Sequence, residues 1–319
     1  MKRLLIIDAN ALLHRAFHAL PSLSSKTGVP VGGVYGFFSI LIKALSDLKP
    51  DYLVACFDLP KPTLRHKKYP EYKATRPKTD PELIRQFPIL RAILESLGIP
   101  LLEKEGYEAD DAIGTVVTKI AKERPDIENI ILTGDLDTLQ LVNSQTKILT
   151  PQRGLVKPII YDEKRLKERF GGIKPEQIID YKGLKGDPSD NIPGVPGVGE
   201  KTALKLIKRF GSLEKIYQAL ENKKELKKLK EEKFLSQTLI KKLKENKDLA
   251  FFSKELATIQ KDVPLNFDLS KAKWQPDPER IKKAFREIGF PSLYQRFLKL
   301  VGQEKKEEKK EKPFQERLF

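Results

Sequence analysis

The first half of the chain alternates short apolar runs with segments in which apolar residues recur at helical spacing. Four runs are short and apolar enough to be buried strands: Leu4–Asp8, Tyr52–Phe57, Ile99–Leu102 and Ile130–Thr133. The intervening segments with helical spacing are Val34–Leu48, Pro81–Leu97 and Asp110–Glu123. Strand–helix alternation of this kind predicts an α/β fold with a mainly parallel sheet and helices on both faces.

The second half is predicted to be largely helical. A turn or hairpin is expected at Gly154–Pro158, and the helical patterns beyond it are Asp162–Phe170, Pro175–Gly183, Glu200–Phe210, Ser212–Leu220, a lysine-rich stretch to Lys244 and two short helices within Pro278–Leu300. We expect residues 1–171 to form the α/β core and residues 172–300 a helical subdomain packed on it. Residues 301–319 are expected to be a charged, solvated tail.

Aspartates follow three of the predicted strands at or near their ends. Asp8 ends the first strand, Asp58 follows the second, and Asp135 and Asp137 come just after the last. One such aspartate is commonly a turn former or a helix N-cap. Because parallel strands present their carboxyl ends to a common crevice, several carboxylates there would repel one another unless a cation neutralised them.

Further acids lie in two short motifs. Glu108, Asp110 and Asp111 open a predicted helix, and the helix dipole accounts for one or two of them but not for all three. Asp187 and Asp190 lie in a loop, where an Asx turn is an equally good explanation. Since no histidine or cysteine accompanies these nine carboxylates, they indicate oxygen ligation of two Mg²⁺ or Mn²⁺ ions and not of zinc.

The charge balance limits the class of partner. Lysine and arginine number 60 against 44 aspartates and glutamates, which gives a net charge of +16. A polyanion is therefore the default partner, although surplus lysine kept for solubility or heat resistance is an equally good explanation. One cysteine excludes a disulfide framework. No apolar run is long enough to cross a bilayer and no signal peptide is evident, so we expect a cytoplasmic, nucleoid-associated protein without a membrane partner.

Residues 59–80, called the arch segment below, combine basic residues with tyrosines and prolines. The residues concerned are Lys61, Arg65, Lys67, Lys68, Tyr69, Tyr72, Lys73, Arg76 and Lys78. This composition favours a mobile loop or arch over a polyanion, with an ordinary solvated loop as the alternative.

A glycine-rich motif spans Gly194–Thr202. It is not a phosphate-binding P-loop, because Glu200 separates Gly199 from Lys201 and no strand precedes it. Between two helices it is typical of a tight hairpin whose backbone N–H groups hold a phosphate, with a basic helix following. The residues expected to bind DNA are Lys61, Arg65, Lys67, Lys68, Gly194, Gly197, Gly199, Lys201, Thr202 and Lys205.

Taken together, these motifs resemble a known family. The order LLIIDANALLHRAFHAL, VYGFF, FDLPKPTLRHKKYPEYKATRP, GYEADD, LTGDLDTLQL and GDPSDNIPGVPGVGEKTA is similar to the 5′ nuclease domain of bacterial DNA polymerase I and to the phage 5′ exonucleases and flap endonucleases. The resemblance covers nearly the whole chain, from residue 2 to about residue 300. It implies a PIN-like core, a helical arch through which a 5′ end passes, and a helix–three-turn–helix at 186–209 that binds duplex DNA.

The resemblance also implies the roles of individual residues. The first metal site would comprise Asp8, Asp58, Glu108, Asp110 and Asp111, and the second Asp135, Asp137, Asp187 and Asp190. Arg15, Lys73 and Arg76 match basic residues around the scissile phosphate, and Tyr72 lies beside them. A K⁺ ion in the hairpin at Gly194–Gly199 is a further expectation. Leu136 departs from the pattern, because many relatives carry a basic residue there.

The expected function is therefore metal-dependent hydrolysis of branched, nicked or 5′-flap DNA by a monomer. Because no polymerase follows residue 319, a DNA polymerase is expected to act in trans. The tail residues Gln315, Leu318 and Phe319 resemble a peptide that docks on the bacterial sliding clamp. Two alternatives stay open, namely a non-catalytic module that binds branched DNA and a PIN-type ribonuclease.

Overall fold

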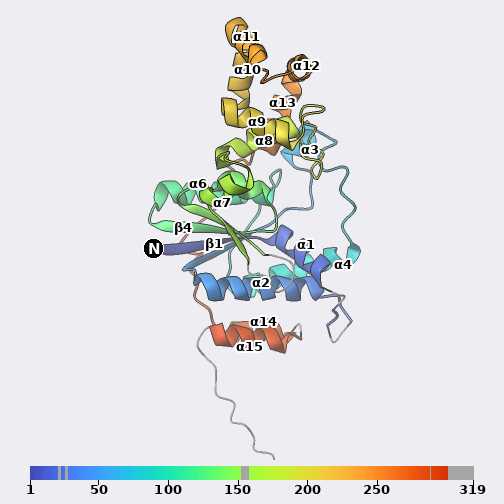
Figure 1. The fold of residues 1–319 in the computed structure, drawn as a ribbon. Coiled ribbons are helices and arrows are strands. Elements are labelled where there is room, and N and C mark those ends of the chain that lie inside the picture. Colours follow the sequence, from blue (N-terminus) through green and yellow to red (C-terminus); the bar gives the residue numbers. More distant parts are fainter. Residues whose placement is uncertain (21–22, 26–27, 152–157, 288, 301–319) are drawn as a thin grey trace, which may run out of the picture.

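The computed structural model describes residues 1–300 apart from 21–22, 26–27, 152–157 and 288 (Figure 1). The tail at 301–319, including the expected clamp-binding residues, and most of the expected turn at Gly154–Pro158 lie outside the described residues. Of the helices that the structure describes, none has both the length and the apolarity that crossing a membrane requires.

A six-stranded sheet with the order β3-β2-β1-β4-β5-β6 forms the centre of the fold. Its strands are β1 (Lys2–Asp8), β2 (Tyr52–Cys56), β3 (Leu101–Leu102), β4 (Ile127–Leu132), β5 (Thr146–Thr150) and β6 (Ile159–Tyr161). Neighbouring strands are parallel except for β5 and β6. The mainly parallel sheet and the four predicted strands are confirmed, whereas β5 and β6 are not among the predicted strands. Because the strand order reverses at β1, the carboxyl ends of β1, β2 and β4 border one crevice.

Helices make up most of the remaining chain. They are α1 (Ala9–Ala19), α2 (Gly32–Leu48), α3 (Leu64–Lys68), α4 (Pro81–Ile84), α5 (Gln86–Ser96), α6 (Ala109–Glu123), α7 (Glu163–Arg169), α8 (Ile178–Lys185), α9 (Glu200–Phe210), α10 (Leu213–Glu221), α11 (Lys223–Glu231), α12 (Gln237–Glu245), α13 (Lys247–Ala257), α14 (Pro278–Glu287) and α15 (Pro291–Leu300), with 3₁₀ turns η1 (Asp137–Leu141) and η2 (Pro175–Gln177). Each predicted helix is present. Helices α1, α3 and α13 lie outside the predicted helical segments, and α1 begins at once because Asp8 both ends β1 and caps α1.

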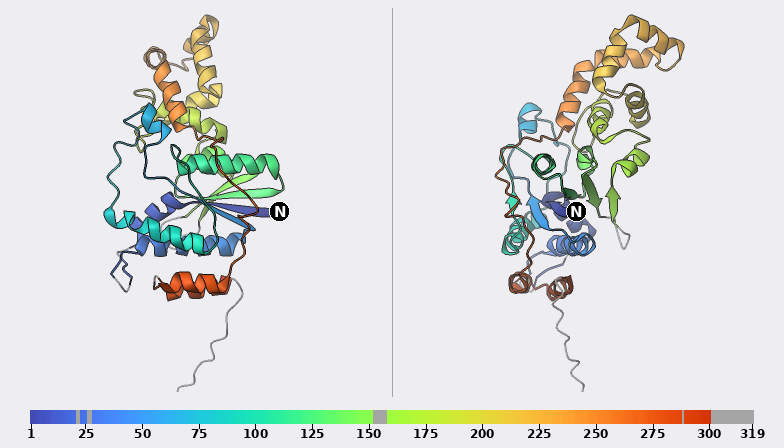
Figure 2. Two further views of the ribbon diagram at one scale, coloured as in Figure 1. Left: turned by 180° about the vertical axis from the view of Figure 1, so that it is seen from behind. Right: turned by 90° about the vertical axis from the view of Figure 1, so that its left-hand side faces the viewer.

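Both faces of the sheet are covered, as predicted, because successive side chains of a strand point to opposite faces. Leu4 and Ile6 of β1 belong to the core on the side of α6, whereas Leu5 and Ile7 belong to the core formed with α1, α2 and α5. Figure 2 shows the two helical layers on either side of the strands. Helices α8 to α13 extend away from the sheet on the α6 side (Figure 1).

The last helices occupy an unexpected place. Helices α14 and α15 pack on α2 and α5, on the face of the sheet opposite to the helical subdomain (Figures 1 and 2). Phe285 and Phe297 are fully buried there, and the ring of Phe285 meets that of Phe38 edge-on at 5.2 Å. The expectation that residues 172–300 form one subdomain is therefore wrong for residues 278–300, because their apolar faces complete the core beneath α2.

The arch segment packs against both parts of the molecule. The Tyr72 ring is 3% exposed, and the Lys73 N–H donates to the Asp190 carbonyl oxygen at 2.9 Å. The alternative of an ordinary solvated loop is therefore wrong for Tyr72 and Lys73, because α3 and the turn after it lie over the carboxyl edge of the sheet, where an arch was expected.

Candidate active site

Asp8 lies at the centre of the crevice. Its Oδ1 accepts the Ala11 N–H at 3.0 Å and its Oδ2 accepts the Thr133 hydroxyl at 2.6 Å, and the side chain is buried. Burial raises the pKa of Asp8 to about 7, with Asp58 and Asp135 adding to the effect against the two hydrogen bonds. The carboxylate is thus fixed in orientation, and within the part of the chain that the structure describes no ion pair involves it.

Three more carboxylates surround Asp8. Asp58 follows β2 and accepts the Ala109 N–H at 2.7 Å, Asp110 lies in the first turn of α6, and Asp135 follows β4. Burial, together with Asp135 and Asp8, raises the pKa of Asp110 well above its usual value, and burial also raises that of Asp58. The convergence expected from the strand ends is therefore present in the structure.

These acids line a cavity of about 390 Å³ together with basic side chains. The lining residues that bear on the chemistry are Asp8, Asp58, Glu108, Asp110, Asp135, Arg15, Lys73 and Arg76. Positive and negative groups thus share a single concave site. Its basic side chains suit an anionic ligand, and its carboxylates suit cations that would bridge the acids to that anion.

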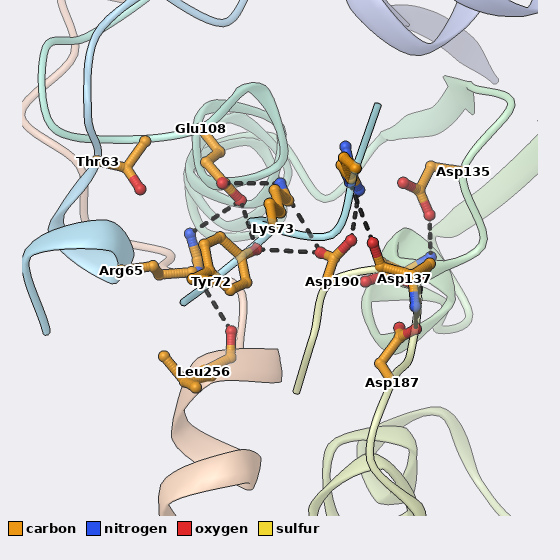
Figure 3. Close-up of polar contacts among 12 residues, drawn as sticks. Thr63, Arg65, Tyr72, Lys73, Glu108, Asp135, Asp137, Asp187, Asp190 and Leu256 are labelled. Atoms are coloured by element: carbon orange, nitrogen blue, oxygen red, sulfur yellow. Dashed lines mark hydrogen bonds and ion pairs between the residues drawn. The ribbon is translucent and has the colours of Figure 1, made fainter. Parts of the chain in front are cut away.

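The arch segment supplies several of the polar groups (Figure 3). Lys73 donates to Glu108 Oε1 at 2.8 Å, and the Tyr72 hydroxyl donates to Glu108 Oε2 at 3.2 Å and to Asp190 Oδ2 at 3.1 Å. Arg76 forms an ion pair with Asp190. Lys73 has a φ of 57°, a left-handed conformation that side chains other than glycine rarely adopt. The tight turn directs Tyr72, Lys73 and Arg76 toward the acids.

Asp137 and Asp187 form a second acidic group between the core and the helical subdomain. Lys182 of α8 donates to Asp187 Oδ2 at 2.7 Å and also to Asp137 Oδ1. Burial and Asp135 raise the pKa of Asp137 to about 7 although Lys182 opposes the shift. Burial by itself would raise the pKa of Asp187, but Lys182 and Ser189 outweigh burial and lower this pKa below its usual value.

Lys182 is absent from the predicted site. The only signal in the sequence is its position five residues before Asp187, and this signal is weak in a chain so rich in lysine.

Asp111 does not belong to the acidic cavity. Its oxygens accept the Arg65 guanidinium at 2.7 and 2.8 Å, the Gln260 N–H at 2.8 Å and the Glu108 N–H at 3.0 Å. Only 1% of its side chain is exposed. The prediction of Asp111 as a metal ligand is corrected, because every oxygen is engaged in a structural network.

The prediction of Arg65 as a DNA-binding residue is corrected for the same reason. Besides Asp111, its guanidinium donates to the carbonyl oxygens of Leu256 and Thr258 at 3.0 and 2.7 Å. It therefore joins the arch segment, α6 and the end of α13, and it is not available to contact DNA. By contrast, Lys61, Lys67 and Lys68 are exposed on the arch segment, and two of them pair with Glu105 and Glu255 at the surface.

The glycine-rich motif forms the expected hairpin between α8 and α9. Gly194 and Gly197 have φ values of 63° and 77°, and a Cβ on Gly194 would overlap the backbone of Lys185 and Gly186. Gly199 caps α9, and a Cβ there would meet open space.

Helix α9 presents a basic concave surface of about 530 Å³. Its lining residues are Lys201, Leu204, Lys205, Lys208, Arg209 and Phe234. Lys205 lies over the Phe234 ring at 4.2 Å and donates to the Phe234 carbonyl oxygen at 2.9 Å, while Thr202 is half-buried on the same helix. Phe234 was not predicted, and its position depends on the fold of the loop between α11 and α12.

Metal ligation requires a rearrangement of the side chains. Within the part of the chain that the structure describes, no three histidine, cysteine, aspartate or glutamate side chains are already placed to hold one ion. Instead, Lys73, Arg76 and Lys182 occupy carboxylate oxygens that a hard divalent cation would use.

Comparison with known proteins gives a consistent picture. Residues 3–171 match the family described as 5′-3′ exonuclease, N-terminal resolvase-like domain, and residues 173–280 match 5′-3′ exonuclease, C-terminal SAM fold. The chain is 44% identical over 296 residues to a DNA polymerase I of Bacillus subtilis, covering 92% of this chain and 32% of that protein. A thermostable DNA polymerase I of Thermus thermophilus is 37% identical over 295 residues, covering 92% and 33%. The chain spans about a third of the length of the curated relatives that it matches.

A solved structure supports the fold. The flap endonuclease of bacteriophage T5, in a complex with DNA and metal ions, is similar with a TM-score of 0.64 at 20% identity, over 95% of this chain and 100% of that one. The expected PIN-like core is confirmed by this likeness and by the observed sheet.

Proposed function

The chain belongs to the 5′-3′ exonuclease family, and we propose that it is a structure-specific 5′ nuclease acting on branched, nicked or 5′-flap DNA. It would combine 5′-3′ exonuclease and 5′ flap endonuclease activity in primer removal and DNA repair. The proposal rests chiefly on one observation, the convergence in a single cavity of Asp8, Asp58, Asp110, Asp135, Arg15, Lys73 and Arg76.

Two Mg²⁺ or Mn²⁺ ions are the cofactors that this set of donors suits. The first would be held by Asp8, Asp58, Glu108 and Asp110, and the second by Asp135, Asp137, Asp187 and Asp190. Burial and nearby carboxylates raise the pKa of Asp8, Asp58 and Asp110, although Lys73 and Arg76 oppose the shift at Asp58 and Lys73 opposes it at Asp110. A divalent cation would therefore stabilise the charged form of these acids. When bound, such ions promote attack of water on a phosphodiester and stabilise the charge on the leaving oxygen.

The basic residues of the cavity would stabilise the reacting phosphate. Arg15, Lys73 and Arg76 line the same cavity as the acids, where positive groups oppose the charge that develops on the phosphoryl oxygens. Tyr72 would act as a positioning residue, because its hydroxyl contacts both Glu108 and Asp190 and so joins the two acidic groups.

Duplex DNA would be held by the hairpin and α9. The Gly194 N–H is buried and donates to the Ser253 hydroxyl at 2.9 Å, so the expectation that it contacts a phosphate is corrected and Gly194 only shapes the turn. Gly197 and Gly199 are exposed and would let their backbone N–H groups approach a phosphate, and Lys201, Thr202 and Lys205 lie on the helix that follows. Such contacts grip the backbone without reading sequence. The hairpin at 194–199 is also where we propose a K⁺ ion. Lys61, Lys67 and Lys68 would contact the single strand that the arch segment admits.

The remaining assignments follow from the same proposal. Residues 1–171 would form the nuclease core with the arch at 59–80, and the helices from 172 onward the DNA-binding part, with α14 and α15 returning to the core. The protein would act as a cytoplasmic, nucleoid-associated monomer beside a DNA polymerase supplied in trans. Residues 315–319 would dock on the sliding clamp.

Cleavage assays test the proposal directly. A 5′-flap duplex, a nicked duplex and an RNA–DNA hybrid are incubated with Mg²⁺ or with EDTA. We expect flap cleavage with Mg²⁺, none with EDTA, and none by Asp110→Asn, while the variant still binds DNA. Asp126→Asn is a matched control, because Asp126 is an exposed acid before β4, at the opposite edge of the sheet. Flap cleavage that persists in EDTA or in Asp110→Asn would reject the proposal.

A further inference from the structure

Lys182 lies between two acids that come from different parts of the chain. Its ammonium group donates to Asp137 of η1 and to Asp187, which follows α8. Figure 3 labels the two aspartates, Asp137 and Asp187. The Lys182 side chain is 12% exposed, and those of Asp137 and Asp187 are 24% and 13% exposed. The contact therefore lies in a largely enclosed position, where opposite charges interact strongly.

Three acids of the cavity at the carboxyl edge of the sheet, Asp8, Asp58 and Asp110, differ from Asp137 and Asp187 in their ion pairs. Among the described residues, no lysine or arginine forms an ion pair with Asp8, Asp58 or Asp110. Lys182 thus pairs directly with both Asp137 and Asp187, whereas Lys73 pairs with Glu108 and, within the described ranges, leaves Asp8, Asp58 and Asp110 without a direct ion pair.

The ammonium and a divalent cation need the same oxygens. Lys182 Nζ lies 2.7 Å from Asp187 Oδ2 and also contacts Asp137, whereas Mg²⁺ binds carboxylate oxygens at about 2.1 Å. Both cations cannot occupy the space between these two carboxylates. An ammonium carries one positive charge and a divalent cation carries two. Displacement of Lys182 is therefore favourable only when the free energy gained by binding the metal ion exceeds the free energy lost with the ion pair.

We propose that Lys182 is a built-in counterion that competes with a divalent cation for the Asp137–Asp187 pair. The inference rests on the proposed metal-dependent function, since it concerns how the second ion binds. Filling is then ordered: the first ion binds at Asp8, Asp58 and Asp110, which form no direct ion pair among the described residues, and the second binds more weakly because it must displace Lys182. In the metal-free protein, Lys182 keeps the core and the helical subdomain joined at this point.

Direct measurement of Mn²⁺ binding tests this. Wild-type protein, Lys182→Met, Lys182→Arg and Lys185→Met are titrated with Mn²⁺ and the free ion is followed by electron paramagnetic resonance. In the wild type we expect a tight and a weak class of site. Lys182→Met should tighten the weak class about tenfold or more, because a neighbouring opposite charge changes such equilibria by one or more powers of ten.

The other two variants serve as controls. Lys182→Arg keeps a positive charge and should leave the weak class weak. Lys185→Met removes a lysine from the same helix whose ammonium lies over the Tyr181 ring, and it should change neither class. If Lys182→Met left the Mn²⁺ affinity of the weak class unchanged or lowered it, the inference about Lys182 would be overturned, but the proposed function would not. Absence of Mn²⁺ binding by the wild type would overturn the proposed function, and the inference with it.

A second measurement uses the wild type and needs no stable variant. The Lys182 ammonium should give a protected ¹H–¹⁵N signal in the metal-free protein, identified by its loss in Lys182→Arg. We expect this signal to disappear or shift only as the second equivalent of Mg²⁺ binds. A signal unaffected by Mg²⁺ would contradict the displacement of Lys182.

Discussion

Thr133 donates a hydrogen bond of 2.6 Å from its hydroxyl to the Asp8 carboxylate, and both side chains are buried. The same hydroxyl accepts the Asp135 N–H at 2.9 Å. One oxygen atom at the end of β4 therefore fixes both the Asp8 carboxylate and the backbone that carries Asp135. Hydrogen bonds to metal-ligating groups commonly determine their orientation, so Thr133 is a positioning residue in the proposed site.

Thr133→Val should weaken Mn²⁺ binding by about tenfold or more, which is the usual effect of losing such a partner. The free energy of unfolding should fall by about 1–3 kcal/mol, because the partly buried Asp135 N–H loses its acceptor and the buried Asp8 carboxylate loses its donor. Titration with Mn²⁺ and urea unfolding measure the two effects. Thr133→Ser keeps the hydroxyl and should retain most of the Mn²⁺ affinity. Equal affinity in Thr133→Val and wild type would contradict the role.

Arg65→Met should lower the free energy of unfolding by about 3–5 kcal/mol, since it leaves the buried Asp111 carboxylate without its bidentate partner. The control Arg124→Met removes an exposed ion pair with Asp126 and should cost about 1 kcal/mol or less. Urea unfolding compares the two. A loss in Arg65→Met as small as in the control would show that the Arg65–Asp111 pair is not structural.

The position of Asp111 illustrates what the sequence could and could not predict. Asp8, Asp58 and Asp135 were predicted to converge because parallel strands bring their carboxyl ends to one edge, and this general rule holds here. Adjacent helical residues point about 100° apart, however, so Asp110 faces the cavity while Asp111 faces Arg65. Spacing alone did not reveal which of the two would face the acids.

The packing of elements that lie far apart in the sequence could not be predicted either. The amphipathic pattern of 278–300 predicted two helices correctly, but it could not indicate that α2 and α5 would provide the surface that covers them. Similarly, the contact of Lys182 with Asp137 depends on how α8 docks on the core. Local patterns predict elements, whereas the packing partners follow only from the complete fold.

The metal-free protein should lose stability as the pH rises from about 4 to about 7. Asp8 and Asp137 have pKa values raised from 3.8 to about 7, so between these values the folded state binds more protons than the unfolded state. Under this condition the free energy of unfolding falls with rising pH. Urea unfolding in EDTA at pH 5 and pH 7.5 measures the loss, which Asp8→Asn should reduce. A pH dependence identical in wild type and Asp8→Asn would contradict the assignment to Asp8.

Lys201→Ala should weaken binding to duplexes of any sequence equally and reduce the slope of log K against log salt by about 1, as expected for one phosphate contact. Lys201 is exposed in the first turn of α9 and lines its basic surface. Fluorescence anisotropy at several salt concentrations gives the slope. Lys43→Ala is a suitable control, because Lys43 pairs with Asp47 on α2, far along the chain from the hairpin. An unchanged slope in Lys201→Ala would remove this residue from the DNA-binding surface.

The most direct test of the central claim is the position of bound ions in crystals grown with Mn²⁺, located from their anomalous scattering. Two peaks are predicted, one among Asp8, Asp58 and Asp110 and the other beside Asp135, Asp137 and Asp187, with Lys182 moved away from the second. If no peak lies in the acidic cavity, or if Mn²⁺ binds only elsewhere on the molecule, the proposed metal-dependent nuclease site is wrong.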